Sequence, residues 1–295
     1  MRLLVTIPHY VHSVPDQGAS ADGRAHGSVW GGAAIRGRAL GGCLASLRQL
    51  FGPDQCLIDI AGHRAVPVNT GTMAARLDVV VCTTRDCHAL GSVEASAGAF
   101  EHRETAAEPL FLGFECHAVL RERLGDYDYY AYMEDDLALR DPWFFAKLAW
   151  FNGHLGDDLL LQPNRYEAAE GASPIAKAYL DGDIAPRATA RYQDLSVAPS
   201  LRSLFLDRWV RFTRPTNPHS GSFFLNARQM KQWSDRPDFL DRDAGFIGPL
   251  ESAATLGVMK TFRVYKPAPE NAAFLEVEHA GTAFLRRIKR PAPES

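Results

Sequence analysis

The sequence predicts an α/β domain in which helices flank a central, mostly parallel sheet. Short apolar runs alternate with segments of helical periodicity, as a parallel sheet with crossover helices requires. The chain has 295 residues, of which 46% are hydrophobic, enough for the core of one large α/β domain or two small ones. No internal repeat breaks the alternation, so we expect one domain over residues 1–295.

The first part of the chain supplies the expected alternation of strands and helices. Residues 2–7 form an apolar run stopped by Pro8, which is typical of a buried first strand. Residues 40–51 have helical spacing that ends at a Gly-Pro pair, and this predicts the first crossover helix. Two more apolar runs, at 56–60 and 77–83, are expected to be further strands of the same sheet.

The middle of the chain predicts a helix, a strand and another helix. Thr105 and Glu108 have the spacing of a capping box before a helix over 110–124. Residues 129–133 are aromatic and apolar, which favours a strand. Asp141-Pro142 is expected to cap and start a helix that runs through residue 150.

The last third of the chain has weaker hydrophobic periodicity, which still predicts strands and helices. Strands are expected at 209–212, 222–225 and 261–265, and helices at 227–233 and 248–256.

Two segments have no such pattern. Residues 15–32 are rich in Gly, Ala and Ser, which predicts a mobile loop that could cover a bound ligand. Residues 166–200 have weak periodicity with scattered Gly, Pro and charge, and their role is not assigned from the sequence.

The composition excludes several classes of function. Thirty-two basic residues against 35 acidic ones give a net charge of -3, so nucleic acid is not an expected partner. Five scattered cysteines do not form a disulfide framework, which favours a reducing, cytoplasmic environment. No run approaches the roughly 20 apolar residues of a membrane helix. A basic tail over 286–295 is expected to be solvated, with weak peripheral contact to anionic lipid as the alternative.

Three consecutive acids follow the strand expected at 129–133. Glu134, Asp135 and Asp136 repel one another unless a positive charge lies nearby. Mg²⁺ and Mn²⁺ prefer carboxylate oxygens and keep positions open for phosphate, so the cluster suits a metal that bridges to a diphosphate. The alternative is an acidic N-terminus for the following helix.

This element also resembles a known family. Residues 132–136, Tyr-Met-Glu-Asp-Asp, followed by Asp-Pro-Trp-Phe at 141–144, resemble the DxD-type element of GT-A glycosyltransferases. The opening Val-Thr-Ile-Pro at 5–8 and the helix at 38–47 are similar to the first strand and helix of family 2 and related inverting enzymes. The matches run in the family's order, with Glu-Asp-Asp in place of Asp-x-Asp.

Three further segments complete the resemblance. His-Ser-Gly-Ser-Phe-Phe-Leu at 219–225 is similar to the glycine-containing loop and strand after the metal motif, where backbone approaches the donor sugar. Phe-Ile-Gly-Pro-Leu-Glu at 246–251 resembles the acceptor-side segment, which implies Glu251 as the general base. Glu278-His279 matches the late histidine, which implies that His279 joins Asp136 in binding Mn²⁺ or Mg²⁺.

The nucleotide-sugar donor is expected at the carboxyl ends of the first strands, where open α/β sheets bind ligands. Pro8 and Asp59 lie at two such ends, and Asp78, at the start of the third strand, is a weaker choice. The residues that we expect to contact the donor are Thr6, Pro8, Asp59, Glu134, Asp135, Gly221 and Ser222.

The predicted protein is therefore a glycosyltransferase that moves a sugar from a nucleotide-diphosphate sugar to an acceptor hydroxyl, with inversion. Its nucleotide-binding part is expected over about 1–136 and its acceptor and metal-completing part over about 137–285. A sugar nucleotidyltransferase is one alternative, but the glycine-rich segment has only Arg24 as a cation. A catalytically silent scaffold that binds nucleotide sugars is the other alternative. Hydrolysis of the donor in solution would distinguish such a scaffold from an enzyme.

Overall fold

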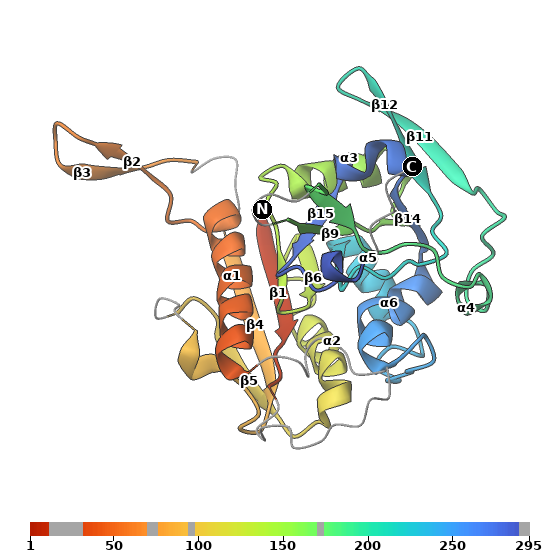
Figure 1. The fold of residues 1–295 in the computed structure, drawn as a ribbon, viewed down its shortest axis with the longest axis horizontal. Coiled ribbons are helices and arrows are strands. Elements are labelled where there is room, and N and C mark those ends of the chain that lie inside the picture. The colour runs from red at the N-terminus through yellow and green to blue at the C-terminus, as the bar shows by residue number, and fades with distance from the viewer. Residues whose placement is uncertain (12–31, 70–75, 94–97, 170–173, 289–295) are drawn as a thin grey trace, which may run out of the picture.

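A central five-stranded sheet organises the chain (Figure 1). The computed structural model describes residues 1–11, 32–69, 76–93, 98–169 and 174–288. In the order β13-β6-β1-β4-β5, the strands are β13 (Ser222–Asn226), β6 (Tyr129–Met133), β1 (Arg2–Pro8), β4 (Arg76–Thr84) and β5 (Glu101–Thr105). All neighbours pair in parallel except β13, which is antiparallel to β6. The predicted α/β fold class with a mostly parallel sheet is confirmed.

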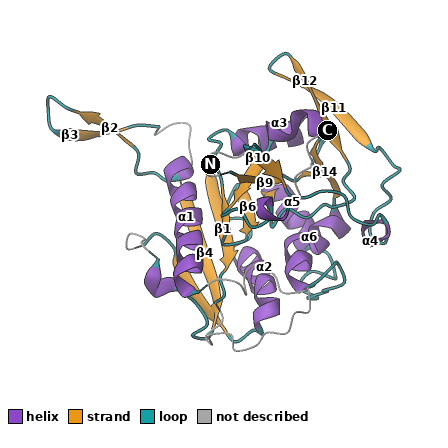
Figure 2. Cartoon of the chain, viewed as in Figure 1, coloured by secondary structure: helices purple, strands orange, loops and turns teal. Residues whose placement is uncertain are grey.

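Helices cover both faces of this sheet (Figure 2). The core on one face includes residues of α1 (Ala33–Phe51) and α3 (Phe144–Leu155). The core on the other includes residues of α2 (Leu112–Glu122) and α6 (Pro249–Thr261), with α5 (Ala227–Ser234) beside them. Because β1 is buried on both faces, its sequence is a continuous apolar run without polar alternation.

A four-stranded sheet of order β10-β9-β15-β7 lies beside the acidic end of β6. Its strands are β10 (Lys177–Tyr179), β9 (Asn164–Ala168), β15 (Glu276–His279) and β7 (Leu137–Ala138). The strand β15 pairs in parallel with β9 and antiparallel with β7, with His279 opposite Leu137. This pairing brings a late segment of the chain next to the turn that carries the three acids.

Another four-stranded sheet, of order β11-β12-β14-β8, extends into a two-stranded ribbon (Figure 1). It consists of β11 (Ser200–Phe205), β12 (Arg208–Thr213), β14 (Arg263–Pro267) and β8 (Leu159–Leu161). The short helices are α4 (Arg187–Ala190), η2 (Leu90–Ser92), η3 (Pro109–Phe111), η4 (Pro269–Phe274) and η5 (Leu285–Arg287). No described helix is long and apolar enough to cross a membrane.

The strand expected at 56–60 is not part of the central sheet. Among the described residues, β2 (Cys56–Asp59) pairs only with β3 (Arg64–Pro67), and the two form a hairpin that points away from the body (Figure 1). Its apolar side chains are exposed, so they do not contribute to the core. The second parallel strand beside β1 is β4.

Other local predictions also differ from the structure. Thr105 does not cap a helix, because it ends β5 and its hydroxyl donates to the carbonyl of Thr83 (3.0 Å). Pro109 starts a 3-10 turn instead, and α2 follows it from Leu112. The unassigned stretch 166–200 contains the end of β9 together with β10 and α4. The expected loop at 15–32 lies, except for Gly32, outside the described residues.

Candidate functional site

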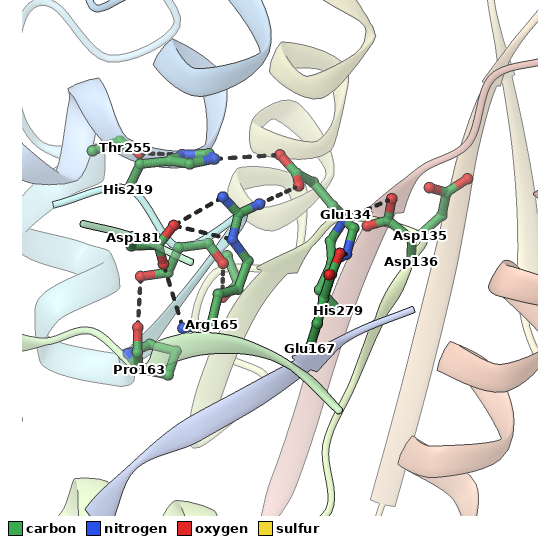
Figure 3. A network of polar contacts seen from close by, with 12 residues as sticks. Glu134, Asp135, Asp136, Pro163, Arg165, Glu167, Asp181, His219, Thr255 and His279 are labelled. Carbon is green, nitrogen blue, oxygen red and sulfur yellow. Dashed lines mark hydrogen bonds and ion pairs between the residues drawn. The ribbon is translucent and has the colours of Figure 1, made fainter. Parts of the chain in front are cut away.

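The three acids occupy the turn that follows β6, at the carboxyl edge of the sheet (Figure 3). Asp135 is buried, and its carboxylate accepts hydrogen bonds from His9 and Arg36. Because Ala89 N donates to His9 Nε2 (3.1 Å), the ring proton of His9 lies on Nδ1, which donates to Asp135 Oδ2 (2.5 Å). The guanidinium of Arg36, on α1, donates to Asp135 Oδ1. Asp135 is thus held rigidly, with both oxygens satisfied.

Asp136 points toward the strand that carries His279. Its Oδ2 accepts from Arg36 Nη1 (3.2 Å) and lies 3.7 Å from His279 Nε2. Burial opposes ionisation, but the charges of His279 and Arg36 hold the pKa of Asp136 below its usual value. The other oxygen, Oδ1, is buried and has no hydrogen-bond partner among the described residues. An ionised carboxylate with one unsatisfied oxygen has capacity for a cation.

His279 has a second acidic neighbour. Its Nδ1 lies 3.2 Å from Oε1 of Glu167, a fully buried residue of β9. The Glu167 carboxylate also accepts from the backbone N–H groups of Phe284 (3.0 Å) and Leu285 (2.7 Å). Phe284 meets the imidazole edge-on, at 5.5 Å between ring centroids. Glu167 therefore fixes the segment after β15 and, with it, the position of the imidazole.

Glu134 is directed to the opposite side of the turn (Figure 3). Its Oε2 accepts from Arg165 Nη1 (3.4 Å), and its Oε1 lies 3.9 Å from His219 Nε2. Burial raises the pKa of Glu134 to about 8, although Arg165 opposes the rise. The charges of Asp136 and Glu251 push this pKa in the same direction as burial. These influences favour the protonated form of Glu134 over the carboxylate.

A buried charge network supports this side of the site. Asp181 accepts from Arg165 Nη2 (2.9 Å) and from Lys266 Nζ (3.1 Å). Lys266 also donates to the carbonyl of His219 (2.5 Å), and the His219 ring meets Thr255 Oγ1 through Nδ1 (3.1 Å). Burial works against ionisation of Asp181, yet Lys266 and Arg165 lower its pKa to about 2. The network fixes Arg165 and His219, which in turn face Glu134.

Glu251 lies in the first turn of α6, after Pro249. Its side chain is half-buried, and it is near enough to Glu134 to influence the ionisation of that group. The structure therefore brings together Glu134, Asp135, Asp136, Glu251 and His279 around the end of β6.

Gly221 also belongs to this group. Its carbonyl accepts from Glu134 N (2.9 Å), and its φ of +61° is in the left-handed region. A Cβ atom there would lie 2.5 Å from Glu134 Oε2 and would displace that carboxyl group.

Other predicted donor contacts are placed differently. Thr6 is fully buried and its hydroxyl donates to Ala131 O (3.1 Å), a bond within the sheet. Ser222 is buried and donates to Ser220 O (3.2 Å). Pro8 does end β1 at the carboxyl edge, as expected.

Two of the predicted residues are separated from the acids. Asp59 lies on the projecting hairpin, where it pairs with Arg64 (2.9 Å), because 56–59 is not a strand of the central sheet. Asp78 lies near the amino end of β4 and pairs with Arg76 (2.6 Å), since a parallel strand begins at the opposite edge from its ligand-binding end.

A divalent cation fits the pair of Asp136 and His279. Carboxylate oxygen and imidazole nitrogen both bind such ions, and the unsatisfied Asp136 Oδ1 provides a donor atom. The described residues contain no cluster of three or more His, Cys, Asp or Glu arranged to hold a metal by themselves. The remaining positions of a bound ion would therefore fall to substrate oxygens and water.

Comparison with known proteins gives structural similarity at low sequence identity. No protein-family model and no curated protein sequence matches the chain. The crystal structure of TarS from S. aureus has a TM-score of 0.45 at 12% identity, over 96% of this chain and 37% of TarS. TarS 1-349 in complex with UDP-GlcNAc gives a TM-score of 0.40 at 12% identity, over 90% of this chain and 56% of that one.

A second kind of enzyme is also similar. CMP:2-keto-3-deoxy-manno-octonic acid synthetase in complex with CTP gives a TM-score of 0.35 at 12% identity, over 91% of this chain and 92% of the synthetase. The chain spans less than two thirds of the length of TarS in both matches.

Proposed function

We propose that the chain is a glycosyltransferase that transfers a sugar from a nucleoside-diphosphate sugar to an acceptor hydroxyl, with inversion. One observation carries the proposal: Asp136 Oδ2 and His279 Nε2 converge to 3.7 Å at the carboxyl end of β6, and Asp136 Oδ1 is buried and unsatisfied. Open α/β sheets bind nucleotides at this edge. We also propose a cytoplasmic location, on the basis of the cysteine pattern.

In this proposal Asp136 and His279 hold Mn²⁺ or Mg²⁺. Such an ion supplies positive charge to the departing diphosphate. Asp135 does not need to bind the ion, because His9 and Arg36 already occupy its two oxygens.

Glu134 has a different task on the donor side. Burial raises its pKa to about 8, which favours the protonated carboxyl group at neutral pH. The protonated oxygen can donate a hydrogen bond to a sugar hydroxyl, while Arg165 orients the group through Oε2.

Glu251 would accept the proton of the acceptor hydroxyl. A general base must reach the attacking oxygen from the face opposite the leaving group, and this arrangement inverts the anomeric carbon. Glu251 comes from α6, whereas Asp136 and His279 come from the turn after β6 and from β15, so the base and the metal ligands are on different elements.

Thermal unfolding with a panel of nucleoside diphosphates and nucleotide sugars tests the proposal. A ligand at about 100 times its Kd stabilises the fold by roughly 2.7 kcal/mol, and we expect this gain only when Mn²⁺ is present. In Asp136→Ala the Mn²⁺ dependence should vanish, and in His279→Ala it should weaken. Asp59→Ala, on the hairpin, is the matched control and should behave as wild type. Equal nucleotide affinity of Asp136→Ala and wild type would remove the assignment.

Product analysis separates the proposed transferase from the alternatives. A glycosyltransferase releases nucleoside diphosphate from the donor, and a nucleotidyltransferase releases pyrophosphate from a nucleoside triphosphate and a sugar phosphate. A silent scaffold binds the donor and releases neither.

A further inference from the structure

One face of the ribbon formed by β11 and β12 packs against the core. Leu201 and Phe205 point inward, and the Phe205 ring packs edge-on against Trp150 (5.0 Å between centroids) and Phe274 (5.1 Å). These contacts fix the ribbon to the body through α3 and η4. Because side chains alternate along a strand, the intervening residues face outward.

The outward face carries large apolar side chains. Leu204 and Trp209 lie directly opposite each other across the two strands, and they are 47% and 64% exposed. Leu206, in the turn, is 82% exposed. None of the three has a covering element among the residues that the structure describes. Such a cluster at the tip of a projecting ribbon is typical of a surface that contacts a partner (Figure 1).

The backbone of this turn is strained in order to present leucine. The two residues between the paired Phe205 and Arg208 are Leu206 and Asp207, with φ values of +46° and +60°. A two-residue turn of this kind favours Asn or Gly at both positions, and leucine in the left-handed region is disfavoured. An exposed leucine in a strained backbone conformation does not stabilise the fold. We therefore infer that its side chain contacts another molecule.

The charges around the cluster indicate what the partner is. Neither Arg202 nor Arg208 forms an ion pair with an acid among the described residues, although the charge of Arg202 contributes to lowering the pKa of Glu270. Arg202 lies over the ring of Trp209, 5.4 Å from its centroid. Asp207 is the acid of the turn, and Arg211, farther along, is neutralised by Glu270 (2.5 Å).

The tip therefore combines an insertable leucine, an interfacial tryptophan, Arg202 on the outward face, and exposed Arg208 beside the turn, opposite Phe205. We propose that the β11–β12 ribbon docks the protein onto an anionic phospholipid surface. Leu206 and Leu204 enter the acyl boundary, Trp209 lies at the level of the headgroups, and Arg202 and Arg208 meet lipid phosphates. The β2–β3 hairpin, also apolar and exposed, lacks this character because Arg64 is neutralised by Asp59.

Co-sedimentation with vesicles tests the proposal directly. The full chain should bind vesicles of phosphatidylcholine containing one third phosphatidylglycerol, should bind pure phosphatidylcholine much more weakly, and should dissociate as salt rises. Leu206→Asn should weaken vesicle binding about tenfold, which corresponds to about 1.4 kcal/mol. Arg208→Gln should weaken it about fivefold, since one basic residue contributes about 1 kcal/mol near an anionic surface.

The same leucine variant controls for folding. Because asparagine suits the left-handed turn, Leu206→Asn should unfold at the same or a higher temperature than wild type while it binds lipid less well. Ile58→Asn, on the β2–β3 hairpin, removes another highly exposed apolar side chain and should bind vesicles as wild type does.

Three results would overturn the proposal. They are no binding to the anionic vesicles, equal binding to both kinds of vesicle, and undiminished binding by Leu206→Asn. If the chain self-associates without lipid and Leu206→Asn abolishes this, the face belongs to a second copy instead.

Discussion

Replacing Gly221 by alanine should damage the fold and the site together. The substitution places a Cβ where the backbone has a φ of +61°, a conformation that costs a non-glycine residue about 1–2 kcal/mol. The new methyl would also lie 2.5 Å from Glu134 Oε2 and 3.2 Å from a methyl of Leu137. One of these neighbours must move.

The carboxylate of Glu134 is the group that moves, because Leu137 is fully buried in the core. Its displacement breaks the hydrogen bond from Arg165, a loss of about 1.5–3 kcal/mol for a bond to a charged group. Together with the backbone cost, we expect Gly221→Ala to lower the free energy of unfolding by about 2.5–5 kcal/mol.

Denaturation in urea measures this quantity, and calorimetric titration with the donor measures the effect on the site. Gly153 supplies the control, because it lies within α3 and a Cβ added there would meet no atom within 4 Å. Gly153→Ala should stabilise the protein by about 0.5–1 kcal/mol through helix propensity. If the free energy of unfolding of Gly221→Ala lies within about 0.5 kcal/mol of the wild-type value, the steric reasoning is wrong.

Three further predictions address catalysis, the buried charges and pH. Glu251→Gln should reduce turnover by about 10² to 10⁴ while the donor Kd changes by less than about threefold; if turnover survives, Asp241 and Asp243 are the next bases to test. Asp181→Asn should lower the free energy of unfolding in urea by about 3–5 kcal/mol, because it removes the acidic partner of buried Lys266 and one of the two acids that pair with Arg165. Burial lowers the pKa of His117 from 6.5 to about 4, so the neutral ring stabilises the fold fully above pH 6.5 and this contribution declines toward pH 4. The decline should amount to about 3 kcal/mol, and denaturation curves of His117→Gln should lack it; an equal pH dependence in both proteins would contradict the assignment.

The strand order along the chain was partly predictable from hydrophobic runs. β1, β4, β6 and β13 all appear where apolar runs predict them, because a strand buried on both faces needs continuous apolar sequence. The run at 56–60 has the same character but is exposed on a hairpin. Periodicity alone does not distinguish the two cases, since what decides them is whether another element covers the strand.

The candidate site was predictable only where residues are neighbours in sequence. The acids after β6 follow from their position beyond a strand, whereas Arg36, Arg165 and Glu167 were missed. Each owes its place to pairing with residues far away in the chain. Arg36 did leave one signal: it lies four residues before Leu40, on the apolar stripe of α1, where a charge needs a buried partner.

The position of β15 has a consequence for biosynthesis. The backbone N–H of Ala280 donates to Asp136 O (2.7 Å), so the last strand of the site closes over acids that are synthesised about 140 residues earlier. A ribosome-bound chain that has exposed only residues up to 270 holds the three acids of the turn and Glu251, yet it lacks His279. Because contacts so distant in sequence form late, the growing chain passes through a stage in which its acidic turn is exposed and unsupported. The contact between Asp136 and His279 can therefore form only after translation has passed His279.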